Sequence, residues 1–508
     1  MPPPPHSAKT VPDWIAHHAR TTPDKLALRD LSGGRDFSYR QMDTRVAGVA
    51  GLLTQAGVGP GDRVAYLMPN STDTIELIFA AWRCGAIAVA VNFRLAVPEV
   101  LHILDDSGAR LLLIDREMAE IGASLREARP NLTLIETDGM GGASPFEAGA
   151  DTAAAPARPD IAPGDPAMLM YSSGTTGRPK GVILTHGMIE ASVHSFLIAA
   201  DIGARAGVLV ATPIFHIAAL IMAMNALYPG GTALVARSFD PGAFLDAVDQ
   251  PALGVTHALV VPAILRALLA HPHSETTDMS RLRALLAGAE KVPPDLITAW
   301  RDRGVPVREG YGMTESTATN AIFPDGGPAD KVGSIGVPLM HVEMAVLTTD
   351  GAPCPNGTVG ELVMRGPVVT PGYWNNPEAT AAAQIHGWFR TGDLGLRDAD
   401  GYFYIRDRAK DMYISGGENV YPAEVESVLH AHPAIAEAAV IGVPDVRWGE
   451  AGCAFVVTAE PLEAEAVLAH CRAHMAGYKC PTTVRFVAAL PRNATGKVQK
   501  FRLRQDLG

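Results

Sequence analysis

Short runs of aliphatic residues alternate with longer segments of helical periodicity between about residues 60 and 300. The runs that predict strands, each bounded by Gly, Pro or Asp, are Arg63–Leu67, Leu111–Ile114, Gly207–Ala211, Thr232–Ala236 and His257–Val261. Ile75, Ile78, Phe79 and Trp82 are spaced by three or four residues, which predicts a helix with one buried face. Alternation of this kind is typical of βαβ units, so we expect an α/β domain with largely parallel sheets.

The pattern changes at about residue 330, where strands and turns replace the helical segments. Gly360–Met364 and Gly401–Ile405 are examples, and they predict a β-rich subdomain over about 330–406. A smaller α+β unit is expected after about residue 410, because Pro422 opens a helical segment and Ala438–Val443 has the pattern of a strand. We therefore expect a large α/β N-terminal domain over residues 1–406, a hinge at 407–411 and a small C-terminal domain over 412–508.

Composition narrows the class of protein. Hydrophobic residues make up 47% and charged residues 19% of the 508 residues, which favours packed domains over disorder. The formal net charge of −12 disfavours nucleic acid as a partner, and the five cysteines include no CxxC pair that would suggest a zinc site. The longest apolar stretch, Ile217–Tyr228, is about half of a membrane span. We expect a cytoplasmic protein with no transmembrane segment; the sequence leaves a homo-oligomer open.

A loop rich in glycine and hydroxyl groups follows the apolar strand at residues 167–170. The residues expected to hold a polyphosphate are Ser172, Ser173, Gly174, Thr175, Thr176, Gly177 and Lys180. The glycines let backbone amides turn towards one point, the hydroxyls add donors, and the lysine adds positive charge. The loop is not a Walker A loop, because Pro179 replaces its second glycine and Gly181 its Ser or Thr. A flexible surface loop would have a similar composition but would explain neither the lysine nor the preceding strand.

Five further motifs occur in order along the chain: Tyr311–Glu315, Trp388–Asp393, Asp407–Asp411, Gly416–Glu426 and Pro491–Lys497. With the loop, they resemble the signature of the adenylate-forming superfamily of acyl-CoA synthetases, aryl-CoA ligases, luciferases and peptide-synthetase adenylation domains. The resemblance covers nearly the whole chain and implies that the small C-terminal domain is a mobile lid. Within the superfamily, the sequences of these motifs are most similar to those of bacterial fatty-acyl-CoA ligases.

The resemblance implies how the base and the outer phosphates of ATP are held. The loop from Ser172 to Lys180 is matched to the site of the β- and γ-phosphates. The backbone of Gly288, Ala289 and Glu290 falls where the family lines the adenine pocket, and Tyr311 and Gly312 complete that pocket, with the Tyr311 ring stacked on the base.

The same resemblance assigns the inner phosphate, the metal ion and the ribose. Thr314 is matched to a contact with the α-phosphate, and Glu315 to a ligand of Mg²⁺, a hard cation that prefers oxygen ligands. Asp393 is matched to the carboxylate that accepts both ribose hydroxyls, and Arg408 to a second ribose or phosphate contact.

The C-terminal residues carry the catalytic and hinge roles that the resemblance implies. Lys497 is matched to the lysine that stabilises charge in the adenylation transition state. Lys410 is matched to the hinge of the lid, and Gly416 and Gly417 to a loop that meets the pantetheine of CoA.

His216 bears on the substrate. Amino-acid-activating relatives typically have an aspartate at this position for the substrate's ammonium group, so an amino-acid substrate is disfavoured. The resemblance implies that His216 is a gate beside the acyl pocket; an ordinary hydrogen-bonded histidine at a strand end is the alternative.

The resemblance implies a two-step reaction that uses ATP, Mg²⁺ and CoA. A carboxylate and ATP give an acyl-adenylate and pyrophosphate, and the CoA thiol then gives acyl-CoA and AMP. We expect a fatty acid as the substrate. Two alternatives stay open: an aryl-CoA ligase of the ferulate or coumarate type, and an adenylation enzyme that loads a carrier protein. Glu290 and Lys291 stand where many relatives have an Ala-Pro pair, a departure that bears on nucleotide or acyl preference.

Overall fold

The computed structural model describes residues 10–152, 156–172, 179–289, 291–408, 411–415, 418–445, 448–475, 477–492 and 496–507. The chain forms two compact units: Met1–Glu343 with Arg365–Gly387, and Met344–Met364 with Trp388–Gly508. The expected β-rich region is therefore divided between the units at residues 343, 365 and 388. The expected hinge at 407–411 includes residues 409 and 410, which lie outside the described residues, so that boundary stays a prediction.

A six-stranded sheet in the first unit has the order β6-β5-β3-β4-β7-β8. Its strands are β3 (Arg63–Leu67), β4 (Ile87–Val91), β5 (Leu111–Asp115), β6 (Thr133–Thr137), β7 (Pro166–Ser172) and β8 (Lys180–Thr185). Neighbouring strands are parallel, except that β8 runs antiparallel to β7. Every residue of β4 and β5 is buried, as expected of parallel strands that are covered on both faces.

A nine-stranded sheet in the same unit has the order β15-β14-β13-β12-β11-β9-β10-β1-β2. Its strands are β1 (Leu26–Asp30), β2 (Arg35–Ser38), β9 (Gly207–Val210), β10 (Thr232–Val235), β11 (Val255–Val260), β12 (Ala284–Ala287), β13 (Val307–Met313), β14 (Ala318–Ile322) and β15 (Val337–Pro338). The six strands from β13 to β1 are parallel, and antiparallel strands flank them on both sides. The expected α/β class is confirmed.

Helices and 3₁₀ turns connect these strands. The helices are α1 (Trp14–Thr21), α2 (Tyr39–Gln55), α3 (Thr72–Arg83), α4 (Val97–Ser107), α5 (Ala119–Ala128), α6 (Pro145–Thr152), α7 (His186–Ala200), α8 (Ile217–Leu227), α9 (Pro241–Asp249), α10 (Pro262–Ala270), α11 (Pro294–Arg301) and α12 (Pro377–Ala382). The 3₁₀ turns are η1 (Arg116–Met118), η2 (Pro251–Leu253), η3 (Pro272–Glu275), η4 (Thr314–Ser316) and η5 (Ala329–Lys331). A short strand, β18 (Gln384–Ile385), follows α12.

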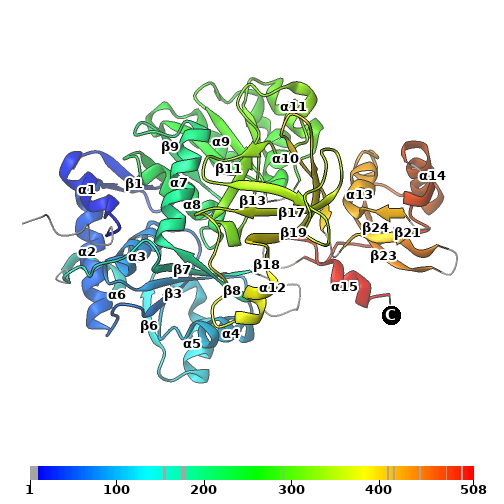
Figure 1. Ribbon diagram of the computed structural model, residues 1–508. Coiled ribbons are helices and arrows are strands. Elements are labelled where there is room, and N and C mark those ends of the chain that lie inside the picture. The colour runs from blue at the N-terminus through cyan, green and yellow to red at the C-terminus, as the bar shows by residue number, and fades with distance from the viewer. Residues whose placement is uncertain are drawn as a thin grey trace, which may run out of the picture. The chain divides into compact units, whose positions relative to one another are not determined.

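Helix α8 contains the longest apolar run of the sequence. It packs against α7 and against strands β9 and β10, beside α7 in the middle of Figure 1. Its side chains are buried except for the half-buried Ala218, so the run is explained by a core helix of 11 residues. In the part of the chain that the structure describes, no helix is long and apolar enough to cross a membrane.

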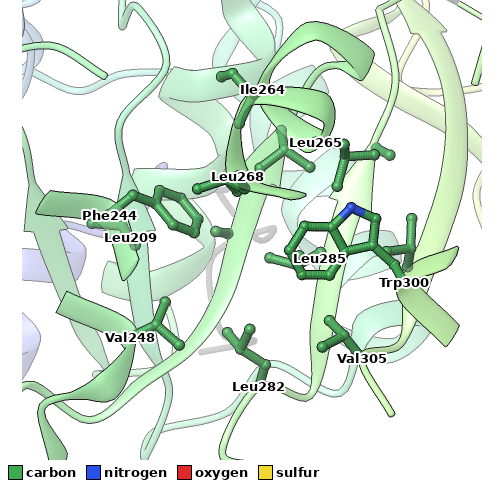
Figure 2. Close-up of a cluster of buried hydrophobic side chains, with 14 of the residues drawn as sticks. Leu209, Phe244, Val248, Ile264, Leu265, Leu268, Leu282, Leu285, Trp300 and Val305 are labelled. Atoms are coloured by element: carbon green, nitrogen blue, oxygen red, sulfur yellow. The ribbon is translucent and has the colours of Figure 1, made fainter. Parts of the chain in front are cut away.

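A cluster of buried side chains fixes helices α9, α10 and α11 on the nine-stranded sheet (Figure 2). Phe244 of α9, Leu265 and Leu268 of α10 and Trp300 of α11 belong to this cluster together with Leu285 of β12. Burying a large apolar side chain stabilises a fold by roughly 1.5–3 kcal/mol. The cluster therefore gives a firm base to the strands whose carboxyl ends carry the predicted site.

The described residues of the second unit form two sheets and three helices. An antiparallel sheet has the order β16-β17-β19, with β20 paired to β19; these strands are β16 (Glu343–Leu347), β17 (Gly360–Arg365), β19 (Trp388–Arg397) and β20 (Phe403–Arg408). The other sheet has the order β22-β21-β24-β23, with β25 paired to β24; these strands are β21 (Tyr413–Ser415), β22 (Glu418–Val420), β23 (Ile435–Asp445), β24 (Gly449–Thr458) and β25 (Thr483–Phe486). The remaining elements are helices α13 (Pro422–His430), α14 (Ala464–His474) and α15 (Lys500–Gln505) and the 3₁₀ turn η6 (Gly477–Lys479).

Candidate active site

The two strands that flank the predicted phosphate loop meet at its base. Ser172 ends β7 and Lys180 begins β8, and the two residues are partners across this antiparallel pair. The hydroxyl and the ammonium group therefore start from neighbouring positions on one sheet edge. The other expected loop residues, Ser173, Gly174, Thr175, Thr176 and Gly177, lie outside the described residues.

Glu315 occupies the centre of the described site. It lies in η4, directly after β13, and is 7% exposed. The hydroxyls of Ser172 and Tyr373 both donate to its Oε1, each at 3.1 Å. The Thr370 N–H donates to its backbone oxygen at 2.8 Å, which fixes the main chain as well. The structure thus brings Ser172, Lys180 and Glu315 together, and Thr314 precedes Glu315 in η4.

Tyr373 is a site residue that the sequence did not reveal. Its ring lies under the Lys180 ammonium, with Nζ 5.3 Å from the ring centroid, a cation–π contact. Burial, reinforced by the neighbouring Glu315 carboxylate, raises the pKa of the Tyr373 hydroxyl far above its ordinary value, so the group stays a donor. A tyrosine in the turn Pro371–Trp374 has no periodicity or spacing that would signal this role.

The expected adenine-pocket residues lie at the carboxyl ends of two adjacent parallel strands. Gly288 and Ala289 follow β12, whereas Tyr311 and Gly312 lie on β13. A Cβ on Gly288 would lie 2.7 Å from the Gly310 oxygen, so the two backbone segments approach too closely for a side chain at position 288. Ala289 has a φ of 67°, a left-handed conformation that a non-glycine residue adopts at a cost. Backbone strain of this kind, at strand ends, is typical of a binding site.

Glycine is required at position 312 as well. A Cβ there would lie 1.4 Å from the Ala318 oxygen, because β14 folds back tightly on β13. The turn between these strands also holds Thr317 at a φ of 56° and Ala318 at 78°. The tight return places η4, which contains Glu315, against β8. Glu290, the last expected residue of this pocket, lies outside the described residues.

Glu309, two residues before Tyr311, is a second feature that the sequence did not reveal. Its carboxylate is buried, and burial raises its pKa to about 7. Oε1 accepts a hydrogen bond from the Val292 N–H at 3.2 Å, whereas Oε2 has no hydrogen-bond partner among the described residues. The charge of Lys291 favours the ionised form, but more weakly than burial opposes it.

His216 caps the N-terminus of α8 but makes no side-chain capping hydrogen bond. Its ring centroid lies 4.3 Å from that of Phe215. Burial, and to a lesser degree the positive charge of Arg94, lower the pKa of His216 to about 4. The imidazole is therefore neutral at pH 7 and offers no charge to a ligand.

A cavity of about 160 Å³ opens near the ends of strands β4, β9 and β10. Its lining residues include the aromatic Phe93 and Phe239 and the basic Arg94 and Arg237. Arg237 Nη2 pairs with Asp115 at 2.9 Å, and Arg237 Nη1 is buried with no hydrogen-bond partner among the described residues. Arg237 Nη2 also pairs with Glu117 at 2.9 Å, so two carboxylates face this guanidinium.

The second unit holds the remaining expected residues that the structure describes. Asp393 lies on β19, 3% exposed, and is paired in register with Arg408 of β20. Lys497 is exposed and follows Gly496, which has a φ of 85°. The Arg408 side chain lies outside the described part of the chain, as do Lys410, Gly416 and Gly417.

The residues present fit a magnesium ion that is held mainly by nucleotide oxygens. Both hydrogen bonds that Glu315 receives from described side chains go to Oε1, which leaves Oε2 as a hard oxygen ligand. The described residues include no cluster of three or more His, Cys, Asp or Glu side chains able to hold a metal by themselves. Mg²⁺ is commonly bound through one or two carboxylates together with phosphate oxygens and water, so one such carboxylate is sufficient.

Comparison with known proteins identifies the family of the chain. Two family models match the chain, "AMP-binding enzyme" over residues 15–374 and "AMP-binding enzyme C-terminal domain" over residues 424–497. The chain is 43% identical to a feruloyl-CoA synthase of Amycolatopsis sp, over 97% of this chain and 98% of that protein. It is 37% identical to the long-chain-fatty-acid–CoA ligase FadD13 of Mycobacterium tuberculosis, over 98% of both chains.

A solved structure agrees with the same assignment. The o-succinylbenzoate coenzyme A synthetase from Bacillus subtilis, in complex with ATP and magnesium ion, superimposes with a TM-score of 0.88 at 31% identity. The match covers 98% of this chain and 100% of that one. The chain therefore belongs to the AMP-binding enzyme family, the adenylate-forming superfamily that its motifs resemble, and it is an ATP-dependent acid–thiol ligase that uses Mg²⁺ and CoA.

Proposed function

We propose that this ligase activates an aryl-substituted acid of the ferulate type. The observation that carries the proposal is the 43% identity to a feruloyl-CoA synthase over almost the whole of both chains, against 37% to a fatty-acid ligase. A fatty acid, which the motif sequences favoured, is the second candidate substrate. The cytoplasm stays the predicted location.

The surroundings of His216 support an acid without an ammonium group. The imidazole is neutral at pH 7, and the α8 residues that follow it are apolar. A substrate ammonium group would be desolvated there without a counter-charge, which is costly. An amino-acid substrate is therefore disfavoured on physical grounds, and His216 is proposed to border the acyl group.

The first half-reaction needs positioning and neutralisation of charge. A carboxylate oxygen of the acid attacks the α-phosphorus of ATP, and pyrophosphate departs. We assign the outer phosphates to the loop that begins at Ser172 and ends at Lys180, the adenine to the backbone at Gly288 and Ala289 and the ring of Tyr311, and the α-phosphate to Thr314. Glu315 is assigned as the carboxylate that would hold Mg²⁺, which when bound neutralises charge on the phosphate oxygens.

The second unit supplies the remaining groups of the proposal. Asp393 accepts hydrogen bonds from the ribose hydroxyls, with Arg408 beside it in register. Lys497 stabilises the charge that develops at the α-phosphate, and Lys410 is the hinge about which Gly416 and Gly417 are brought to the pantetheine. These roles follow from the motifs and are proposals for this chain.

CoA is proposed to place a phosphate near Arg94 and Arg237. The support is that two arginines, Arg94 and Arg237, line one cavity together with Phe93 and Phe239, and that Arg237 Nη1 has no hydrogen-bond partner among the described residues. Arg94→Ala should then raise the KM for CoA and leave the KM for ATP unchanged. A KM for CoA equal to that of the wild type would contradict this assignment.

The substrate proposal is tested with a panel of acids. Purified protein is incubated with ATP, Mg²⁺ and ferulate, coumarate, hexanoate or palmitate, with and without CoA, and acyl-CoA is measured by mass spectrometry. We expect kcat/KM for ferulate or coumarate to exceed that for both fatty acids. Higher values for the fatty acids would overturn the aryl proposal in favour of the second candidate. Adenylate formation without any thioester from CoA would favour the carrier-protein alternative.

A further inference from the structure

Two hydroxyl groups hold one carboxylate oxygen in the candidate active site. Ser172 Oγ and Tyr373 Oη each lie 3.1 Å from Glu315 Oε1 and donate to it. Among the described residues, neither these hydroxyls nor any other side chain donates to Oε2. The orientation of the carboxylate is therefore fixed by the protein, and its two oxygens are unequal: one is occupied by donors and the other is available to a cation.

Tyr373 is itself held firmly beside β8. The Trp374 N–H donates to the Gly181 oxygen at 2.7 Å, and the Ile183 N–H donates to the Gly372 oxygen at 3.2 Å. The Tyr373 N–H donates to Thr380 Oγ1 of helix α12 at 3.0 Å. These bonds attach the turn around Tyr373 to the strand that begins with Lys180, so its hydroxyl is a rigid reference point for Glu315.

We propose that Tyr373 is a positioning residue for metal binding: its hydroxyl fixes Glu315 Oε1 so that Oε2 is presented to Mg²⁺. The proposal rests on the role of Glu315 as the magnesium ligand. A free glutamate side chain loses rotamer freedom when it binds a metal ion, whereas one that is already hydrogen-bonded has lost that freedom on folding. Loss of a partner that orients a metal ligand typically weakens metal binding about 10- to 100-fold.

The ring of Tyr373 contacts Lys180, whereas its hydroxyl contacts Glu315. A substitution can remove one contact and keep the other. Tyr373→Phe removes the hydroxyl but keeps the ring under the Lys180 ammonium. Tyr404→Phe is a matched control, because the Tyr404 hydroxyl also donates to a carboxylate, Asp398 at 3.3 Å, in the second unit. Glu315→Gln tests the metal ligand itself.

The test compares ATP binding to the full-length protein by isothermal titration calorimetry, in Mg²⁺ and in EDTA. The quantity of interest is the gain in affinity that Mg²⁺ produces. We expect Glu315→Gln to abolish this gain. In Tyr373→Phe the gain in ATP affinity should be about tenfold smaller than in the wild type, or absent if the wild-type gain is itself below tenfold. The affinity for ATP in EDTA should be unchanged. Tyr404→Phe should retain the wild-type gain.

The outcomes separate this inference from the proposed function. A full wild-type gain in Tyr373→Phe, together with its loss in Glu315→Gln, overturns the role of Tyr373 and leaves Glu315 in place. A wild-type gain in Glu315→Gln overturns the assignment of Glu315 and the inference with it. Thermal melting checks that each variant folds. If Tyr373→Phe does not fold, Tyr373→Met, which also lacks the hydroxyl, is measured in its place, and an unchanged gain there overturns the proposal.

Discussion

The backbone N–H of Val292 donates a hydrogen bond to the carboxylate of Glu309 at 3.2 Å, in the interior of the first unit. This bond satisfies one oxygen of the carboxylate, and the other has no hydrogen-bond partner among the described residues. The pair links the segment after Gly288 and Ala289, the proposed adenine-pocket residues, to strand β13, which carries Tyr311. A charge at Glu309 is therefore unfavourable, and its protonation is coupled to folding.

Glu309→Gln should stabilise the protein at high pH. Burial raises the pKa of Glu309 to about 7, against about 4.3 for an ordinary glutamate, so the folded state binds a proton that the unfolded state releases between these values. The stability that the protonated Glu309 contributes to the folded state is fully present below about pH 4, and it is lost as the pH rises through 7. Urea unfolding of both proteins at pH 5 and pH 8 checks this.

At pH 8 the variant should gain up to about 3 kcal/mol relative to the wild type, with a smaller difference at pH 5. Glutamine keeps the acceptor for the Val292 N–H, so the change mimics protonation. Glu127→Gln, at an exposed position, is the control and should show the same stability difference at both pH values. A pH-independent effect of Glu309→Gln would refute the coupling.

Asp393→Ala should raise the KM for ATP selectively. Loss of a hydrogen bond between a charged acceptor and a neutral donor costs roughly 1.5–3 kcal/mol, which corresponds to about a ten- to hundredfold rise in the KM for ATP. The KM for the acid serves as the internal control and should change much less. Because Asp393 is 3% exposed, thermal melting is measured in parallel. An unchanged KM for ATP would mean that Asp393 has a structural role only.

Lys497→Ala should abolish adenylate formation and spare thioester formation from supplied acyl-adenylate. The reason is that only the first step develops charge at the α-phosphate, where a positioned ammonium group stabilises it. Pyrophosphate exchange measures the first step. The matched control is Lys500→Ala, which breaks an ion pair with Glu426 at 2.8 Å but removes no proposed catalytic group. Exchange at the wild-type rate in Lys497→Ala would refute the assignment.

Lys410→Pro should impair one half-reaction by orders of magnitude and leave the other nearly intact. Proline fixes φ near roughly −65°, which would hold the proposed hinge in one orientation. Thioester formation is the step expected to be lost. Lys410→Ala, which removes the charge and keeps backbone freedom, should affect both steps little. Small and equal losses in pyrophosphate exchange and in single-turnover acyl transfer would place the hinge elsewhere.

The pattern of hydrophobic residues within a segment was sufficient to predict several strands and helices. The aliphatic run Arg63–Leu67 is strand β3 at the same bounds, and the segment opened by Pro422 is helix α13. The phosphate loop was predicted because glycine, hydroxyl groups and lysine stand together in the chain. That its first and last residues, Ser172 and Lys180, are partners across the β7–β8 pair was found only in the structure.

Contacts between distant segments could not be predicted in this way. Tyr373 and Glu315 are separated by 58 positions, and nothing in the turn around Tyr373 indicates a partner in η4. The Val292–Glu309 bond likewise depends on how the chain after β12 packs beside β13. Both are results of tertiary packing, in which a polar group is satisfied by whatever backbone or hydroxyl the fold brings near.

The central claim, activation of a carboxylate as its adenylate, is tested most directly by isotope transfer. The most active acid of the panel, labelled with ¹⁸O at both carboxylate oxygens, is converted to acyl-CoA in the presence of ATP, Mg²⁺ and CoA, and the AMP is analysed by mass spectrometry. Attack of the carboxylate on the α-phosphorus predicts one ¹⁸O atom in each AMP and one in the thioester carbonyl. Unlabelled AMP, or ADP in place of AMP, would contradict the account.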